Sequence, residues 1–323
     1  MPTQSGGRKR RLLDKLLIIS SGAGSITPEV EAKLRAAFDD YEIVDFDPKY
    51  DFRKDLSPTA HVVAAGGDGT IGFVARELAG SKHTFGVLSL GTYNNFSHSL
   101  NLPSELGAAI KVARSGNPRP VTLGIVGDTY FLEAAAVGLF GDAIDLGEAI
   151  KDREFGAMGP KFRAFASAKP FDFEISGDIT GHGKALSLVL NNTPSMGSQM
   201  PVGDSSPIEP FLELSIQVGS SRTDLVGRML ASSVLNKHKE DAGMSFQFRH
   251  IEIHTKPRVT VFADNQKVGR TPVTVEAHPG ALTVLLSRSA PEPTEKRRPA
   301  IGPSQMKSVK PAPAGGSSRK RPA

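Results

Sequence analysis

An apolar run that ends in a cluster of glycines constrains the fold of this chain more than any other feature. Residues 62–74 read Val-Val-Ala-Ala-Gly-Gly-Asp-Gly-Thr-Ile-Gly-Phe-Val. This pattern predicts a buried strand, a glycine-rich turn and a helix in succession. Gly66, Gly67 and Gly69 have no Cβ, so the backbone of the turn can approach a ligand closely. The N–H groups of such a turn, with those that open the next helix, favour an anion.

Asp68 lies in the middle of this turn and narrows what the turn can bind. A carboxylate does not bind phosphate directly, whereas Mg²⁺ prefers oxygen ligands and bridges to nucleotide phosphates. We therefore predict a phosphate cradle with Asp68 as the metal ligand. A plainer interpretation has Asp68 as the N-cap of the next helix and no ligand, and this motif alone does not decide between the two.

A second polar motif follows about twenty residues later. The apolar run Phe85–Leu90 ends in Gly91 and Thr92, and Asn94 opens a new helical segment. In an open α/β sheet, ligands bind outside the carboxyl ends of the strands, so we expect both motifs to face one cleft. Helix capping explains one of the polar residues of this motif, but not all of them.

Together these motifs resemble the diacylglycerol kinase catalytic domain family, which includes bacterial lipid kinases and the sphingosine and ceramide kinases. The family's patterns are GGDGT and a later GTxNDFAR, to which residues 66–70 and 91–98 correspond. The stretch 20–24 stands where the family has Asn-Pro-x-Ala-Gly or Asn-Pro-x-Ser-Gly. Residues 259–266 and 279–282 are similar to its DGE strand and its closing Pro-Gly-Ala-Leu strand. The resemblance covers roughly residues 15–286.

The resemblance implies an ATP-dependent lipid kinase that uses Mg-ATP in an interdomain cleft to phosphorylate a diacylglycerol-like or sphingoid hydroxyl. It implies catalytic roles for Asp68, as metal ligand, and for Asp264, as general base or as the group that orients the base. An Asp at the tip of a hairpin turn explains Asp264 equally well. The residues expected to bind the nucleotide are Ser20, Gly24, Gly66, Gly67, Asp68, Gly69, Thr70, Gly91, Thr92 and Asn94.

Several residues depart from the family's acidic pattern. Asn95 and Gln266 stand where the family has acids, and Glu209-Pro210 replaces an Asp-Gly pair. An amide keeps hydrogen bonding, but it cannot take up a proton and holds Mg²⁺ less well than a carboxylate. The alternative function is therefore a catalytically impaired pseudokinase that binds a nucleotide or a lipid.

Strands and helices alternate in the first third of the chain, which predicts a doubly wound α/β sheet of parallel strands. The expected strands are 15–20, 41–46, 61–65 and 85–90, and the expected helices open at 27–29 or cover about 70–78, 94–100 and 105–114. After residues 116–118 the strands become short and alternating, which predicts a β-rich sandwich with helices near 144–155 and 222–235. The expected strands include 121–126, 129–136, 183–190, 271–276 and 281–286. The expected domains are a disordered basic N-terminus over 1–11, a nucleotide-binding domain over 12–120, a lipid-substrate domain over 121–287 and a disordered basic tail over 288–323.

Charge is distributed unevenly along the chain. Residues 288–323 hold nine Lys or Arg and two Glu, and residues 8–11 are four basic residues. The whole chain has a net charge of +5, so the remaining residues carry a net charge of about −6. Such tails either keep the protein soluble or attract anionic lipid headgroups. With 7% aromatic residues and no Trp, nucleic acid is not favoured as a partner.

Composition also limits the chemistry and the location. The chain has no Cys and no His spacing typical of zinc sites, which excludes disulfides and thiol nucleophiles. No apolar run approaches the ~18 residues of a membrane span, and the first residues lack the apolar segment of a secretory signal. We expect a cytoplasmic protein, peripheral on the inner membrane face, and a homodimer is compatible with the sequence.

Overall fold

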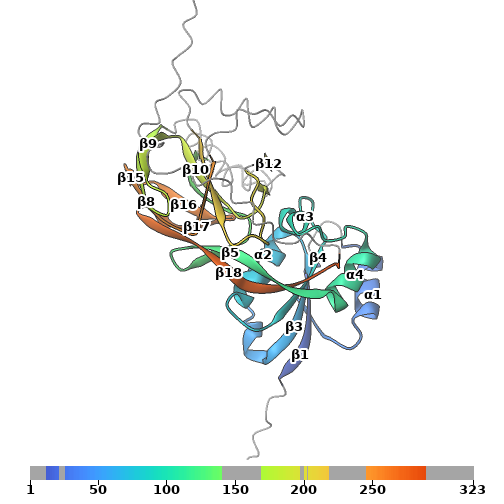
Figure 1. Cartoon of the computed structure of the whole chain (residues 1–323). Coiled ribbons are helices and arrows are strands. Elements are labelled where there is room, and N and C mark those ends of the chain that lie inside the picture. The colour runs from blue at the N-terminus through green and yellow to red at the C-terminus, as the bar shows by residue number, and fades with distance from the viewer. Residues whose placement is uncertain are drawn as a thin grey trace, which may run out of the picture. The chain divides into compact units, whose positions relative to one another are not determined.

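The computed structural model describes residues 12–21, 26–139, 169–196, 200–201, 203–217 and 245–288. These residues form two compact units (Figure 1). Of the described residues, unit 1 takes in those up to Leu123, the segment Ser206–Pro210 and residues 278–288. Unit 2 consists of Gly124–Ser205 and Phe211–Ala277. Gly24 and the predicted helices near 144–155 and 222–235 lie outside the described residues, as do residues 1–11 and 289–323 of the predicted tails.

Unit 1 is built on a parallel sheet. Its strand order is β2-β1-β3-β4-β18, and each neighbouring pair is parallel. The strands are β1 (Leu13–Ile19), β2 (Glu42–Asp45), β3 (Leu56–Gly66), β4 (Thr84–Ser89) and the C-terminal part of β18 (Val273–Leu286). Residues 16–19 and 62–65 are buried throughout, because strands covered on both faces are apolar along their length.

Helices connect these strands, and local sequence explains where they begin. The helices are α1 (Pro28–Ala37), the 3-10 turn η1 (Phe52–Asp55), α2 (Asp68–Leu78), α3 (Asn95–Ser99) and α4 (Leu106–Ser115). The Thr27 hydroxyl caps α1, and the carboxylate of Glu105 caps α4 through two backbone N–H groups. These are ordinary N-cap bonds. Helix α4 packs so closely on β4 that a Cβ on Gly86 would lie 2.5 Å from the Ala113 carbonyl oxygen.

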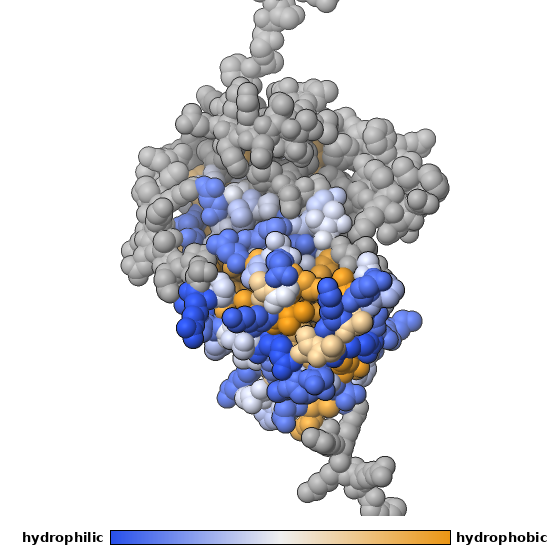
Figure 2. Space-filling view, turned by 90° about the vertical axis from the view of Figure 1, so that its right-hand side faces the viewer, coloured by the Kyte–Doolittle hydropathy of each residue, from blue (hydrophilic) through white to orange (hydrophobic). Residues whose placement is uncertain are grey.

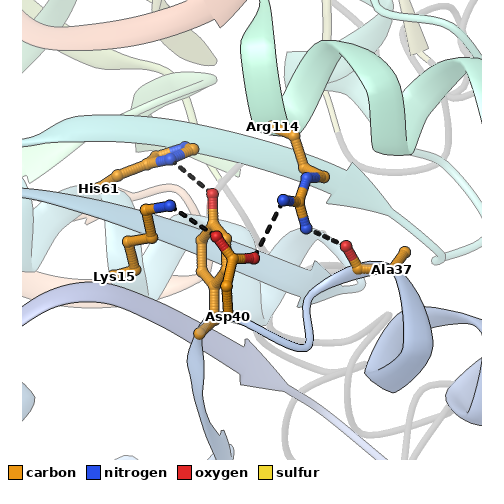
Figure 3. Close-up of polar contacts among 6 residues, drawn as sticks. Lys15, Ala37, Asp40, His61 and Arg114 are labelled. Carbon is orange, nitrogen blue, oxygen red and sulfur yellow. Dashed lines mark hydrogen bonds and ion pairs between the residues drawn. The ribbon is translucent and has the colours of Figure 1, made fainter.

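A polar cluster joins three elements of unit 1 (Figure 3). Asp40, after α1, pairs with Lys15 of β1 at 2.6 Å and with Arg114 of α4 at 3.0 Å. Tyr41 Oη is hydrogen-bonded to His61 Nδ1 of β3 at 2.8 Å. The Arg114 guanidinium lies over the Tyr41 ring, 5.4 Å from its centroid. The cluster therefore ties the end of α1 and the helix α4 to the sheet.

Unit 2 contains two antiparallel sheets. One has the order β14-β13-β10-β7-β16-β17, and in the other the first residues of β18 pair with β15, followed by β8 and β9. The first sheet comprises β7 (Ala134–Gly138), β10 (Ser187–Asn191), β13 (Leu212–Gln217), β14 (Ser245–Phe248), β16 (Thr260–Ala263) and β17 (Gln266–Arg270). The second comprises β8 (Phe171–Gly177), β9 (Gly181–Ala185) and β15 (His250–Lys256).

Alternation of side chains produces the core of unit 2. In β15, Ile251 and Ile253 are buried while His250, Glu252 and His254 are exposed, as expected for a sheet with one covered face. Buried residues of both sheets, such as Phe173 of β8 and Leu190 of β10, belong to one hydrophobic cluster. The fold class predicted from the sequence, a parallel α/β sheet followed by a β-rich sandwich, is confirmed.

Details of the strands differ from the prediction. Two expected strands, 271–276 and 281–286, are one long strand, β18. Expected strands over 129–136 and 183–190 are each divided, into β6 (Thr129–Phe131) and β7, and into β9 and β10. The expected strand 121–126 lies within β5 (Asn117–Val126), which forms a hairpin with β6. The short pair β11 (Ser195–Met196) and β12 (Met200–Pro201) was not expected.

Hydrophobic side chains also reach the surface of unit 1. Figure 2 shows hydrophobic residues between hydrophilic ones on the side that carries α1 and α4. Val30, Leu106 and Ile110 are among the partly buried residues that pack against the core there. Within the described ranges, no helix is both long enough and apolar enough to cross a membrane.

Candidate functional site

The two glycine motifs meet at the ends of neighbouring strands in unit 1. Strands β3 and β4 are parallel, and Gly66 at the end of β3 pairs with Ser89 at the end of β4. Leu90 donates its backbone N–H to the Gly66 carbonyl oxygen at 2.7 Å. A Cβ on Gly91 would lie only 2.7 Å from the Cα of Gly67. The two loops therefore touch, because parallel strands bring their carboxyl ends to one edge of the sheet.

Asp68 links the two loops. Its Oδ2 accepts a hydrogen bond from the backbone N–H of Asn94 at 3.0 Å, and the N–H of Asn95 also bonds to this carboxylate. Burial raises the pKa of Asp68, and these backbone N–H groups oppose that shift. The plainer interpretation of the sequence placed Asp68 as the N-cap of its own helix. The N-cap of α2 is instead Gly67, which has no side chain to cap it.

Two of the glycines are required by packing. A Cβ on Gly66 would lie 2.8 Å from the Cβ of Thr70 and 3.1 Å from the Cβ of Ser20. Gly91 has no room for a side chain because of its contact with Gly67. Thr70 is itself buried, with 6% of its surface exposed, so its side chain packs beneath the turn. What Thr70 can offer a ligand at the turn is therefore its backbone N–H.

The other two glycines are not explained by the fold. A Cβ on Gly67 would meet nothing closer than the Cα of Gly91 at 3.5 Å, an ordinary contact. A Cβ on Gly69 would have no atom of the described residues within 4 Å. Gly67 has φ −84°, and Gly69 lies in the first turn of α2, where alanine is favoured by up to ~1 kcal/mol. Open space beside the first turn of a helix is what a bound anion needs.

The second loop is a closed turn. Asn94 accepts the N–H of Gly91 through Oδ1 at 3.1 Å and donates from Nδ2 to the Gly91 carbonyl at 3.0 Å. Asn94 has left-handed backbone angles, φ 54° and ψ 39°, which Asn tolerates better than most residues. The turn presents Thr92 and Tyr93 to solvent, and Tyr93 is 41% exposed.

The start of α3 faces inward rather than toward this surface. Asn95 is only 1% exposed, so its amide is buried in unit 1. The hydroxyls of Ser89 and Ser97 are hydrogen-bonded, which ties α3 to the end of β4. Sequence reasoning did not find this serine pair, because two serines eight residues apart have no distinctive pattern.

Asp264 belongs to unit 2 and has a clear structural role there. It occupies the turn between β16 and β17 with φ 50°. Its Oδ2 accepts the N–H of Leu132 at 3.0 Å, and its Oδ1 accepts those of Glu133 at 2.9 Å and Ala134 at 3.4 Å. The carboxylate thus holds the connection between β6 and β7. Among the described residues, no group of three or more His, Asp or Glu is arranged to hold a metal ion.

Comparisons with known proteins point to one family. Residues 19–126 match the family model of the diacylglycerol kinase catalytic domain. An uncharacterized protein of Synechocystis is 25% identical over 236 residues, 69% of this chain and 54% of that protein, so the match spans about half of its length. A probable lipid kinase YegS-like of Klebsiella pneumoniae is 29% identical over 238 residues, 71% of this chain and 79% of that protein.

A solved structure shows the same fold. A diacylglycerol kinase from Bacillus anthracis superposes with a TM-score of 0.64, covering 86% of this chain and 99% of that one at 20% identity. The family match extends from the end of β1 to the end of β5 and includes both glycine loops. Residues 19–126 therefore match the diacylglycerol kinase catalytic domain family, the family to which the two glycine motifs pointed.

Proposed function

We propose that the chain binds ATP with Mg²⁺ at the two glycine loops and transfers a phosphoryl group to a lipid hydroxyl. The observation that carries the proposal is the pair Gly67 and Gly69, whose missing side chains leave open space beside the start of α2. The family of residues 19–126 and the names of relatives, which include probable lipid kinases, support the reaction class.

The backbone is the expected phosphate ligand. The first N–H groups of α2 have no partner within the helix, and its N-cap Gly67 supplies no side-chain acceptor. A phosphate beside Gly69 would accept from these groups and would gain from the positive end of the helix dipole. Thr92 is exposed on the adjoining closed turn, where its hydroxyl can donate to the same anion.

Asp68 fits as a Mg²⁺ ligand, directly or through water. An ionised carboxylate has about four lone-pair sites, so the N–H bonds from Asn94 and Asn95 leave acceptor capacity. Mg²⁺ is commonly held by one or two carboxylates together with nucleotide phosphates, which suits a site with a single carboxylate. When bound, the ion would neutralise phosphate charge. The half-buried carboxylate, whose pKa burial raises, would gain from a nearby cation.

Phosphoryl transfer depends mostly on positioning and on charge neutralisation. Asp264 remains our candidate for the acid that accepts or orients the proton of the acceptor hydroxyl. Its three backbone hydrogen bonds keep the carboxylate in one orientation. These same bonds favour the alternative function, a protein that binds nucleotide without turnover, because they occupy acceptor sites of the proposed base.

A turnover assay tests the proposal. Wild-type protein, radiolabelled ATP and Mg²⁺ are incubated with a panel of extracted lipids, and labelled lipid is measured together with ATP affinity. The matched variants are Gly69→Ala and Gly107→Ala, which change the second residue of α2 and of α4 respectively. We expect labelled lipid from the wild type and from Gly107→Ala, and a loss of at least tenfold in Gly69→Ala.

The outcomes separate the two functions. ATP binding without labelled lipid would favour the non-catalytic alternative. Absence of ATP binding, or equal ATP binding by Gly69→Ala and wild type, would refute the phosphate site beside α2.

A further inference from the structure

Tyr93 is an aromatic side chain at the surface of the candidate site. It is 41% exposed and, with Leu12, is one of the two exposed large hydrophobic residues among those that the structure describes. It belongs to neither of the two core clusters described for the chain. Its place in the sequence is the variable position between Thr92 and Asn94 of the second motif.

The backbone that carries Tyr93 is held on both sides. On one side, Gly91 packs against Gly67 and exchanges two hydrogen bonds with the Asn94 side chain. On the other side, the N–H of Asn94 bonds to the Asp68 carboxylate at 3.0 Å. The turn that presents the ring is therefore anchored to the glycine loop and to the first residue of α2. Such an anchored aromatic loses little conformational freedom when it contacts a ligand.

The same contacts bring the backbone next to Tyr93 to the start of α2, where Gly69 lies. Asp68 is the neighbour of Gly69 in α2, and Asn94 is the neighbour of Tyr93. A nucleotide whose phosphates lie against the start of α2 carries its base only one ribose away from them. A base offers a planar face to which aromatic side chains bind by stacking.

We propose that Tyr93 stacks on the base of the bound nucleotide and so distinguishes a nucleotide from a simple polyphosphate. The inference rests on the proposed function, because it assumes that phosphates bind beside Gly69. It assigns the base a protein contact on the second loop, in addition to the backbone contacts that the glycines offer to phosphate. Tyr93 would act by binding, and neither proton transfer nor metal binding is assigned to it.

The test compares two ligands on three proteins. Affinities for Mg-ATP and for Mg-tripolyphosphate are measured by calorimetry on wild type, Tyr93→Ala and Tyr93→Phe. We expect Tyr93→Ala to lower the affinity for Mg-ATP about tenfold, within the usual range for loss of base stacking. The affinity for Mg-tripolyphosphate should not change. Tyr93→Phe keeps the ring and should keep the ATP affinity. Gly69→Ala, which adds a methyl group where the phosphates are proposed to bind, should lower the affinity for both ligands.

Each contrary result has a distinct meaning. Equal ATP affinity in Tyr93→Ala and wild type would overturn the stacking role alone, as would an equal loss for both ligands. A wild type that binds neither ligand would overturn the phosphate site, and the inference with it. Tyr93 is an exposed turn residue, so both variants should fold, and unchanged thermal unfolding would verify this before binding is measured.

Discussion

The carboxylate of Asp68 accepts a hydrogen bond at 3.0 Å from the backbone N–H of Asn94, which lies 26 residues later in the chain. This bond joins the first residue of α2 to the turn that follows β4. Asp68 therefore has two separable properties, an acceptor atom that holds the loops together and a negative charge that can meet a cation. Substitutions can separate the two.

Asp68→Asn should keep the fold while removing the charge. An Asn side chain retains one carbonyl oxygen for the N–H groups of Asn94 and Asn95, so the free energy of unfolding should fall less than in Asp68→Ala. Asp68→Ala leaves both donors without this partner and should cost ~1–3 kcal/mol. Urea unfolding measures both. In Mg²⁺ titrations, both variants should lose the metal dependence of ATP binding, and a metal response retained by Asp68→Asn would argue against Asp68 as the ligand.

The glycines of the first loop should respond in opposite directions. Gly69→Ala should leave stability unchanged or raise it by up to ~1 kcal/mol, because alanine is the better helix former and has room. Gly66→Ala should destabilise by ~1–3 kcal/mol, because its Cβ would lie 2.8 Å from the Cβ of Thr70. Thermal unfolding gives the order of the two variants. Destabilisation by Gly69→Ala comparable to that of Gly66→Ala would show that the fold, and not a ligand, requires glycine there.

Asn95→Asp should not simply restore a lost site. Asn95 is 1% exposed and its N–H contacts the Asp68 carboxylate, so a second carboxylate would be buried near the first. We expect the free energy of unfolding to fall by ~2 kcal/mol at pH 7. The decrease should become smaller toward pH 4, because protonation removes the buried charge. Gln266→Glu is the control: residue 266 is exposed, and its effect should stay within ~0.5 kcal/mol.

Stability should fall in acid through His61. Burial lowers the pKa of His61, with further lowering by Lys15 and Arg114, so the unfolded chain takes up this proton more readily. The contribution of His61 to the free energy of unfolding does not change with pH above its pKa in the unfolded chain, near 6.5. Below that pH, protonation of His61 in the unfolded chain lowers the stability of the fold. Burial also lowers the pKa of His83. Between pH 7.5 and 5.5, Tm should therefore fall for the wild type and fall less for His61→Gln. Equal slopes would contradict the assignment.

Asp264→Asn should affect both stability and rate. The amide has a single oxygen for the three N–H groups that the carboxylate holds, so unfolding should become easier by ~1–3 kcal/mol. If Asp264 is also the base, turnover per folded molecule should fall at least ~10²-fold. Unfolding curves and single-turnover assays under folding conditions measure the two effects separately. A stability loss without a rate loss would leave Asp264 with the structural role alone.

The sequence by itself determined the elements that depend on nearby residues. Apolar runs and glycine turns located β1 to β4, α1, α2 and α4 to within a few residues, because periodicity and turn chemistry are properties of short segments. The two glycine motifs likewise pointed to the family whose model residues 19–126 match. Strand ends in the second half were less accurate, since β18 continues through Pro279 and Gly280, which suggested a break.

Only the tertiary structure decided what the individual site residues do. It showed that Asp68 bonds to Asn94, that Thr70 and Asn95 are buried, and that Asp264 holds residues about 130 positions earlier in the chain. It also separated the glycines that packing requires from those that leave open space. Hydrogen bonds and burial of this kind join distant segments, and no local pattern encodes which segments become neighbours when the sheets close.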